Sequence, residues 1–455
     1  MICVHQKDAE RGKKMKKKTY RMIPMAMLAL TMAACSAVSA DSSTSVRDTE
    51  QTEIQETVQN TTTAETNTET STEVSASDMF TERDLTQSAD LTNAVTYDVT
   101  SGQNITITEE GVYVLRGEAT NVTVTVDAAD TAKVQIVLDG VSITNDSSPA
   151  VYVKSADKVF ITTTDSTNTL KVTGTFTDDG DVSTDAVIFS KDDITINGTG
   201  TLNIESTDNG ITSKDDLKIT GSTIQITCAS DALEANDSVR VAGGTITVNT
   251  AKDGIHAEND EDNTTGFVYI SGGTLKINAG DDAVHATTTL TVDGGNLDLS
   301  GGEALEATQV IINDGTININ ATDDGINASR KSTAYSVKVE ITGGDITIAM
   351  GAGDTDAVDS NGDLLISGGT LNITAQSPFD ADGTVSKTGG TIIVNGTETD
   401  SITNQFMGGM GGQGQMPGGQ MPDGGQMPDG GQMPDGGQMP DGGQMPGGMH
   451  GGGRR

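Results

Sequence analysis

Short runs in which apolar and polar residues alternate recur along the middle of the chain. TITVNT begins at Thr245, TLKINA at Thr274 and TININA at Thr316, and the runs from Thr201 to Thr391 start at steps of 20 to 29 residues. Alternation with a period of two is typical of β-strands that bury one face. A repeat of this length predicts a solenoid, in which each unit buries its apolar face only by stacking on its neighbours.

Each repeat contains three such strands. In the repeat that starts at Thr245, the alternating apolar residues are Ile246 and Val248, then Ile255 and Ala257, then Val268 and Ile270. Glycine pairs such as Gly243-Gly244 mark turns, and the insertions ENDEDNTTGFVY and SRKSTAYSVK should bulge at one corner. The LxxLxLxxN pattern of leucine-rich repeats and the GGxGxD period of calcium nonapeptide rolls do not occur. We therefore expect an all-β chain that forms a parallel β-helix.

Composition divides the chain into five parts. We expect an export signal in residues 1–34, a Ser/Thr/Glu-rich tether in 35–78, a cap with irregular first coils in 79–180, regular coils in 181–404 and a low-complexity tail in 405–455. The tether has almost nothing to bury, so it cannot offset the entropy of ordering. The tail repeats GGQMPD. Its methionines Met421, Met427, Met433 and Met439 suggest either a Cu(I) site or, as we favour, a flexible spacer.

The N-terminal segment resembles a bacterial lipoprotein signal. MKKKTYRMIPMAMLALTMAAC starts at Met15, a second candidate start beside Met1, and has a basic head, an apolar run too short to span a bilayer and a lipobox-like MAAC. This predicts lipidation of Cys35 and a place at the cell surface, attached to the membrane through the lipid alone. A plain secretory signal cut near Ala40 is the alternative. Only Cys228 would remain in the folded part, so no internal disulfide is expected.

Charge narrows the class of partner. The 455 residues contain 27 basic and 65 acidic side chains. Without residues 1–34 the chain keeps 19 basic and 63 acidic side chains, which gives a formal charge of −44. Nucleic acid is excluded as a partner, because a phosphate backbone is bound by Lys and Arg. Metal cations, or polymers reached through bridging cations, fit better.

When the repeats are aligned at the turn before the second strand of each repeat, equivalent positions form two rows of polar residues. We call these rows ladders. The first ladder is Asn209, Asp231, Asp253, Asp282, Glu303, Asp324 and Asp356, and the second is Glu234, His256, His285, Glu306, Asn327 and Asp359. Carboxylates on adjacent coils repel each other unless something compensates them. Calcium could compensate these charges, because it accepts six to eight oxygen ligands in flexible geometry.

The predicted metal ligands are therefore all carboxylates. They are Asp231, Glu234, Asp253, Asp282, Glu303, Glu306, Asp323, Asp324, Asp356 and Asp359. Asp side chains that cap their own turns are the alternative for any one of them. His256 and His285 are expected to relieve crowding among the carboxylates, although transition-metal binding or acid/base chemistry is also open.

Several stretches carry a resemblance to a known family. AVIFSKDDITINGTGTLNIES, NGITSKDDLKITG and the DGI turns resemble bacterial carbohydrate-binding domain-containing proteins, and the similarity covers about residues 96–400. The resemblance implies a calcium-bearing, right-handed parallel β-helix on the cell surface that binds plant-wall polysaccharide such as cellulose or acidic pectin. The chain is more distantly similar to family 9 pectate lyases. Ala232, Ala283 and Ala357 depart from the usual turn glycine.

Three functions remain open at this point. We expect a monomeric, non-enzymatic polysaccharide-binding protein, in which calcium bridges to carboxylated sugars. A calcium-dependent lyase would need a base, for which Lys214, Lys252 and Arg330 are candidates, although each is more simply explained by pairing with a nearby Asp. A surface adhesin or spacer without a sugar ligand is the third. The absence of tryptophan weakens strong binding to crystalline cellulose.

Overall fold

The computed structural model describes residues 79–351 and 355–403. The expected export signal, the tether with Cys35 and the GGQMPD tail lie outside the described residues, so their predictions stay untested. In the described ranges no helix is long and apolar enough to cross a membrane. The short helix α2 (Glu82–Leu85) precedes the strands, and Thr81 caps it with its side chain.

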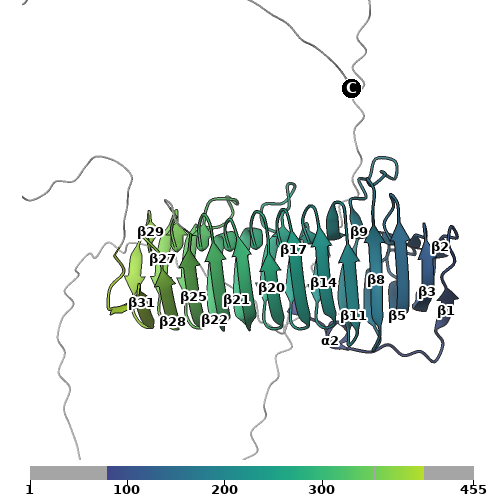
Figure 1. The fold of residues 1–455 in the computed structure, drawn as a ribbon, viewed down its shortest axis with the longest axis horizontal. Coiled ribbons are helices and arrows are strands. Elements are labelled where there is room, and N and C mark those ends of the chain that lie inside the picture. The colour runs from purple at the N-terminus through teal and green to yellow at the C-terminus, as the bar shows by residue number, and fades with distance from the viewer. Residues whose placement is uncertain (1–78, 352–354, 404–455) are drawn as a thin grey trace, which may run out of the picture. The chain divides into compact units, whose positions relative to one another are not determined.

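The strands form one continuous parallel arrangement in which the chain returns to the same side of the core once in every coil (Figure 1). In most coils a strand pairs with the third strand after it, as β10 (Asp193–Gly198) does with β13 (Asp216–Ile219). The pairings divide the strands into three stacks, one for each side of the coil. The predicted all-β, parallel-stranded fold with three strands per repeat is therefore confirmed.

Stack 1 holds the first strand of each coil. Its members are β2 (Ile105–Ile107), β4 (Val124–Asp127), β6 (Val151–Ser155), β9 (Ala186–Ser190), β12 (Asn209–Ser213), β15 (Leu233–Ala235), β18 (Ile255–Ala257), the start of β21 (Val284–Gly301), the start of β22 (Leu305–Ala321), β23 (Ile326–Ala328), β26 (Val358–Ser360) and β29 (Asp380–Ala381).

Stack 2 holds the strands that follow those of stack 1 in each coil, and it includes β10 and β13. The other members are β1 (Val95–Asp98), the first parts of β3 (Gly111–Thr120) and β5 (Lys133–Asn145), β7 (Lys158–Thr163), β16 (Ser238–Val241), β19 (Phe267–Ile270), the middle parts of β21 and β22, β24 (Lys338–Ile341), β27 (Asp363–Ile366) and β30 (Val385–Lys387).

Stack 3 completes each coil. It consists of the ends of β3, β5, β21 and β22 together with β8 (Thr167–Val172), β11 (Thr201–Glu205), β14 (Thr223–Cys228), β17 (Thr245–Thr250), β20 (Thr274–Asn278), β25 (Asp345–Met350), β28 (Thr370–Thr374) and β31 (Thr391–Val394). The final strand, β32 (Thr397–Thr399), turns back antiparallel to β31.

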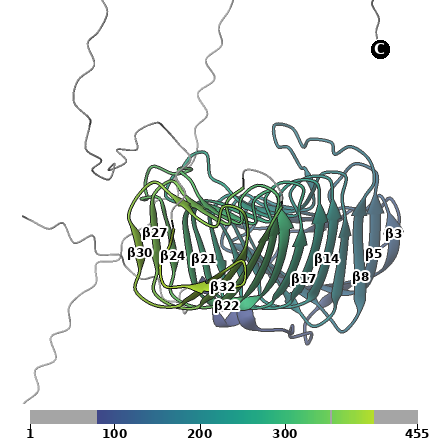
Figure 2. The same ribbon diagram turned by 60° about the vertical axis from the view of Figure 1, so that its left-hand side comes forward.

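One apolar core runs through the coils. In β17 the burial alternates strictly, with Ile246, Val248 and Thr250 buried and Thr245, Thr247 and Asn249 exposed. The three stacks enclose this core on three sides, as the turned view shows (Figure 2). Cys228 is buried as a free thiol, and burial raises its pKa to about 11. The alternate residues of each strand point away from this core, and these outward positions hold the polar residues that are the candidate ligands.

The two insertions lie at the corner between stack 1 and stack 2. They follow β18 and β23, which are separated by the coils of β21 and β22. Their tips nevertheless meet, because Asn263 Nδ2 donates to Thr333 Oγ1 at 2.8 Å and Ser332 Oγ donates to the Asn263 carbonyl at 2.6 Å. The predicted bulge at one corner is present, and the two loops span the corner of the coils between them.

Candidate metal centre

The two predicted ladders lie where the alignment placed them. In the second ladder, strand register pairs Glu234 with His256, His256 with His285, and His285 with Glu306. The register continues from Glu306 to Asn327 and from Asn327 to Asp359. These residues are the outward positions in the middle of stack 1 strands, so their side chains face away from the apolar core.

The first ladder runs beside the second, at the turn that enters stack 1. Three of its carboxylates accept a hydrogen bond from the backbone of the following coil. The Asp253 N–H donates to Asp231 Oδ1 at 3.1 Å, and the Asp282 N–H donates to Asp253 Oδ1 at 2.9 Å. The Asp356 N–H donates to Asp324 Oδ1 at 3.0 Å in the same way. These aspartates thus cap the turn of the next coil instead of their own turn.

Three groups of ladder residues bring possible ligand atoms within 4.8 Å of one another. They are Asp231, Asp253 and His256; Asp253, Asp282 and His285; and Asp282, Glu303 and Glu306. The first two groups include an imidazole nitrogen, which transition metals accept readily. The third contains oxygen ligands alone, as calcium prefers. We call this third group, with Asn327, the acidic centre.

One histidine and one lysine compensate part of the charge around the acidic centre. His285 Nδ1 lies 3.0 Å from Asp282 Oδ2 and 2.8 Å from Glu306 Oε2, and Lys331 Nζ lies 2.5 Å from Glu306 Oε1. Burial alone would lower the pKa of His285, but these carboxylates raise it to about 10. Burial would raise the pKa of Glu306, yet His285 and Lys331 hold it well below its usual range. The predicted role of the histidines in relieving crowding is consistent with these contacts.

Within the described part of the chain, no cationic side chain lies within 4.0 Å of the Glu303 carboxylate. Burial and the neighbouring Glu306 raise its pKa to about 8, so it carries a proton at neutral pH. Asn327 Nδ2 donates to Glu303 Oε2 at 3.0 Å, while Asn327 Oδ1 is buried without a hydrogen-bond partner. A buried oxygen of this kind costs free energy unless it is paired. Because it lies beside Glu303, it is available as a further oxygen ligand, and an all-oxygen donor set is of the type that calcium accepts.

The same crowding extends along the ladders. Burial is the largest cause that raises the pKa of Asp253 and of Asp324, each to about 6. Burial and then Asp324 raise the pKa of Asp359 to about 7. A metal ion must displace any proton from the carboxylates that bind it, so the raised pKa values make metal binding at these residues depend on pH.

Other predicted ligands are less closely gathered. Glu234 accepts from Asn209 Nδ2 at 2.7 Å and from Thr212 Oγ1 at 2.8 Å, and Lys214 Nζ lies 3.1 Å from its other oxygen. Asp323 is exposed on the turn before Asp324. Among the described residues, Glu234, Asp323, Asp324, Asp356 and Asp359 belong to none of the three groups.

Sequence reasoning missed Lys331. It lies in the second insertion, next to the predicted base candidate Arg330, and only the fold brings its ammonium group to Glu306. Glu306 raises the pKa of Lys331 against the effect of burial, so this lysine stays protonated. Lys214 is held by Glu234, whereas Lys252 and Arg330 are exposed.

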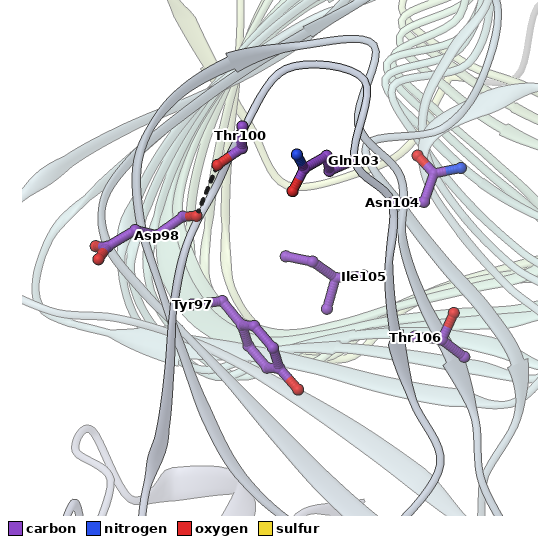
Figure 3. Close-up of a pocket in the computed structure, with 7 residues that line it drawn as sticks. All are labelled: Tyr97, Asp98, Thr100, Gln103, Asn104, Ile105 and Thr106. Carbon is purple, nitrogen blue, oxygen red and sulfur yellow. Dashed lines mark hydrogen bonds between the residues drawn. The ribbon is translucent and has the colours of Figure 1, made fainter.

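A separate hollow lies at the first coil, far from the ladders in sequence (Figure 3). It has a volume of about 290 Å³ and lies between β1 and β2, with Tyr97 and Ile105 on opposite sides. Asp98 is its one carboxylate among the lining residues. The hollow therefore lacks the gathered charges of the acidic centre.

Two known proteins are similar to parts of this chain. A carbohydrate-binding domain-containing protein of Acetivibrio thermocellus is 38% identical over 130 residues, which are 28% of this chain and 46% of that protein. The matched part thus spans about half the length of this relative. A solved structure of a polysaccharide lyase-like protein from C. thermocellum, a gadolinium derivative, is 33% identical, covers 50% of this chain and 96% of its own, and superposes with a TM-score of 0.45.

A family model gives the more extensive match. Residues 101–355 and 301–405 match the model described as carbohydrate-binding domain-containing protein. The two matches overlap and together include stacks 1, 2 and 3 from β2 to β32. The chain therefore belongs to the family of carbohydrate-binding domain-containing proteins.

Proposed function

We propose that this chain is an exported, calcium-stabilised protein of the cell surface that binds acidic plant-wall polysaccharide such as polygalacturonate. The coils would wind right-handed, as the family resemblance implies, and Cys35 would carry the lipid that anchors the chain. The observation that carries the proposal is the acidic centre: Asp282, Glu303 and Glu306 place oxygen atoms within 4.8 Å of one another beside the unpaired Asn327 Oδ1.

Calcium at the acidic centre would hold the coils together and present an open side to a ligand. A calcium ion accepts six to eight oxygens, more than these four residues supply at one oxygen each. The remaining positions are available to water or to a carboxylate of the sugar. Direct charge pairing with a uronate would otherwise be unfavourable, because the chain carries a formal charge of −38.

The test is calcium-dependent binding of the full chain to polygalacturonate, measured by co-sedimentation with calcium and with a chelator. We expect binding with calcium, little with the chelator and weaker binding with magnesium, which demands stricter octahedral geometry. Glu303→Gln should weaken calcium and polygalacturonate binding together, whereas Glu205→Gln, an exposed residue paired with Lys171, should change neither. Equal binding with and without calcium would contradict the proposal.

Product formation separates binding from cleavage in the same samples. A lyase would generate an unsaturated uronate that absorbs ultraviolet light, and the absorbance would rise steadily during incubation with calcium. We propose no catalytic base and expect a flat trace. A steady rise that Lys214→Ala, Lys252→Ala or Arg330→Ala abolishes would establish the enzyme instead.

A further inference from the structure

Residues 79–87 lie across the outer side of stack 2, and we call this segment the strap. Figures 1 and 2 show the segment around α2 against the side of the coils. Phe80 packs against Tyr269 of β19 with ring centroids 6.2 Å apart, and Arg83 lies 4.3 Å above the ring of Phe160 in β7. Gln87 accepts from the Gly198 N–H at 2.8 Å. The strap therefore covers several successive coils.

Asp84 of the strap enters a site built from stack 2. Its carboxylate lies 2.6 Å from Lys158 Nζ and 3.7 Å from Lys218 Nζ, and it accepts from Thr195 Oγ1 at 2.8 Å. Asp84 is fully buried, and the side chains of both lysines are 9% exposed. Burial alone would raise the pKa of Asp84, but Lys158 and the Thr81 N–H hold it well below its usual range. The site recognises a carboxylate by two ammonium groups and a hydroxyl.

The surface around that site differs from the rest of this acidic chain. Strand register places Thr195, Lys218, Arg240 and Tyr269 in one outward row on successive coils. Arg240 lies 4.9 Å from the ring of Phe267, and it pairs with Asp216 at 3.0 Å. Burial and the adjacent Lys158 and Arg240 lower the pKa of Lys218. Asp216 compensates the charge of Arg240, and among the described residues Asp84 is the carboxylate within 4 Å of Lys158 and Lys218.

Phe160 shows that the covered surface is apolar as well as basic. It is 2% exposed although it is no member of the core between the stacks, because Arg83 and Lys158 lie over its ring from outside. Aromatic faces bordered by cations and hydrogen-bonding groups suit a sugar that carries a carboxylate, since its C–H face packs on a ring while its charge pairs with lysine.

We propose that this row of stack 2 is a second binding site for carboxylated sugars, and that the strap closes it by placing Asp84 where the sugar carboxylate binds. The site needs no calcium, because its cations belong to the protein. The choice of ligand class rests on the proposed function. Release of the strap is feasible because its helix is four residues long, too short to be stable alone, and because freeing the segment restores its backbone entropy.

The experiment uses the full chain in the presence of a chelator, so that the acidic centre does not contribute. Binding of a galacturonate hexamer is measured by calorimetry for wild type, for Asp84→Asn, and for Asp84→Asn combined with Lys218→Gln. We expect Asp84→Asn to bind at least tenfold more tightly than wild type and the double variant to lose that gain. Asp139→Asn, which breaks an exposed pair with Arg116, is the matched control and should behave as wild type.

Hydrogen exchange of the wild type gives a readout that needs no variant. Saturating hexamer should speed exchange at the amides of Thr81 to Gln87 as the ligand replaces the strap, whereas a neutral cellulose hexamer should leave them unchanged. Equal hexamer binding by wild type and Asp84→Asn, or no change in exchange, would overturn the proposal. Failure of calcium-dependent binding appears only in the calcium samples, so the two proposals fail separately.

Discussion

At the scale of single residues, the ladders show how groups of the protein limit repulsion within a crowded row of carboxylates. His285 stands between Asp282 and Glu306, and Lys331 approaches Glu306 from the insertion. Glu303 instead keeps its proton. Cationic partners and protonation therefore both limit the repulsion between carboxylates at the acidic centre. A bound calcium ion would substitute for both.

Replacing His285 by Gln should destabilise the chain most when carboxylates cannot take up protons. In a chelator at pH 8 we expect a loss of about 3 kcal/mol, since removing one member of a buried ion pair leaves the others uncompensated. The loss should be smaller at pH 5. Urea denaturation at both pH values measures this, with Lys276→Gln as control because its pair with Asp298 is exposed. An equal loss at both pH values would contradict the charge argument.

At the scale of elements, most strands could be predicted from alternation alone. The predicted starts at Thr223, Thr245 and Thr370 are the first residues of β14, β17 and β28. The separate strands expected around Asn296 and Thr316 are instead parts of the long β21 and β22, because their corners are short enough to remain paired, with register shifts. The strap could not be predicted. Its sequence does not follow the repeat, and Asp84 contacts lysines that lie more than 70 residues away in the sequence.

The glycine turns of the ladder can be tested at this scale. A Cβ at Gly254 would lie 2.6 Å from the Ala283 carbonyl and 2.3 Å from Ile277 Cγ2, so Gly254→Ala must displace backbone or core. We expect a loss of about 1–3 kcal/mol. Gly302→Ala, whose new Cβ would meet nothing closer than 3.4 Å, should change stability by less than about 0.5 kcal/mol. Equal denaturation midpoints for both variants would show that the turn tolerates a side chain.

The ladder pattern itself was visible in the sequence, but the pairing within it was not. Alignment of the repeats identified both rows, because equivalent positions of successive coils stack on one another even though the coils differ in length. It could not show that Asn327 Oδ1 is left unpaired or that Lys331 reaches Glu306. Those contacts depend on side-chain direction and on the conformation of an insertion, neither of which the period determines.

At the scale of the whole molecule, the raised carboxyl pKa values link stability to pH. Folding raises the pKa of Glu303 from 4.5 to about 8 and the pKa of Asp359 from 3.8 to about 7. The folded state therefore binds more protons than the unfolded state between about pH 4 and pH 8. Stability is then greatest below the unfolded values and is lost as pH rises through the folded ones. His285 contributes in the same direction, because folding raises its pKa from 6.5 to about 10, so its contribution to stability is also lost as the pH rises.

The melting temperature in a chelator should therefore fall between pH 5 and pH 8, on the order of 5 °C. Calcium should reduce this fall, because ligand binding stabilises the folded state and competes with the same protons. Differential scanning calorimetry at several pH values with and without calcium measures both. A melting temperature that rises with pH in the chelator would contradict the assigned shifts.

Calcium titration of the full chain at pH 7, followed by calorimetry in two buffers of different ionisation enthalpy, tests the central claim most directly. The acidic centre predicts saturable binding with release of about one proton or more per site, since Glu303 must ionise to coordinate the ion. Glu303→Gln should remove most of the affinity and the proton release. Absence of calcium binding, or binding that Glu303→Gln leaves unchanged, would contradict the account.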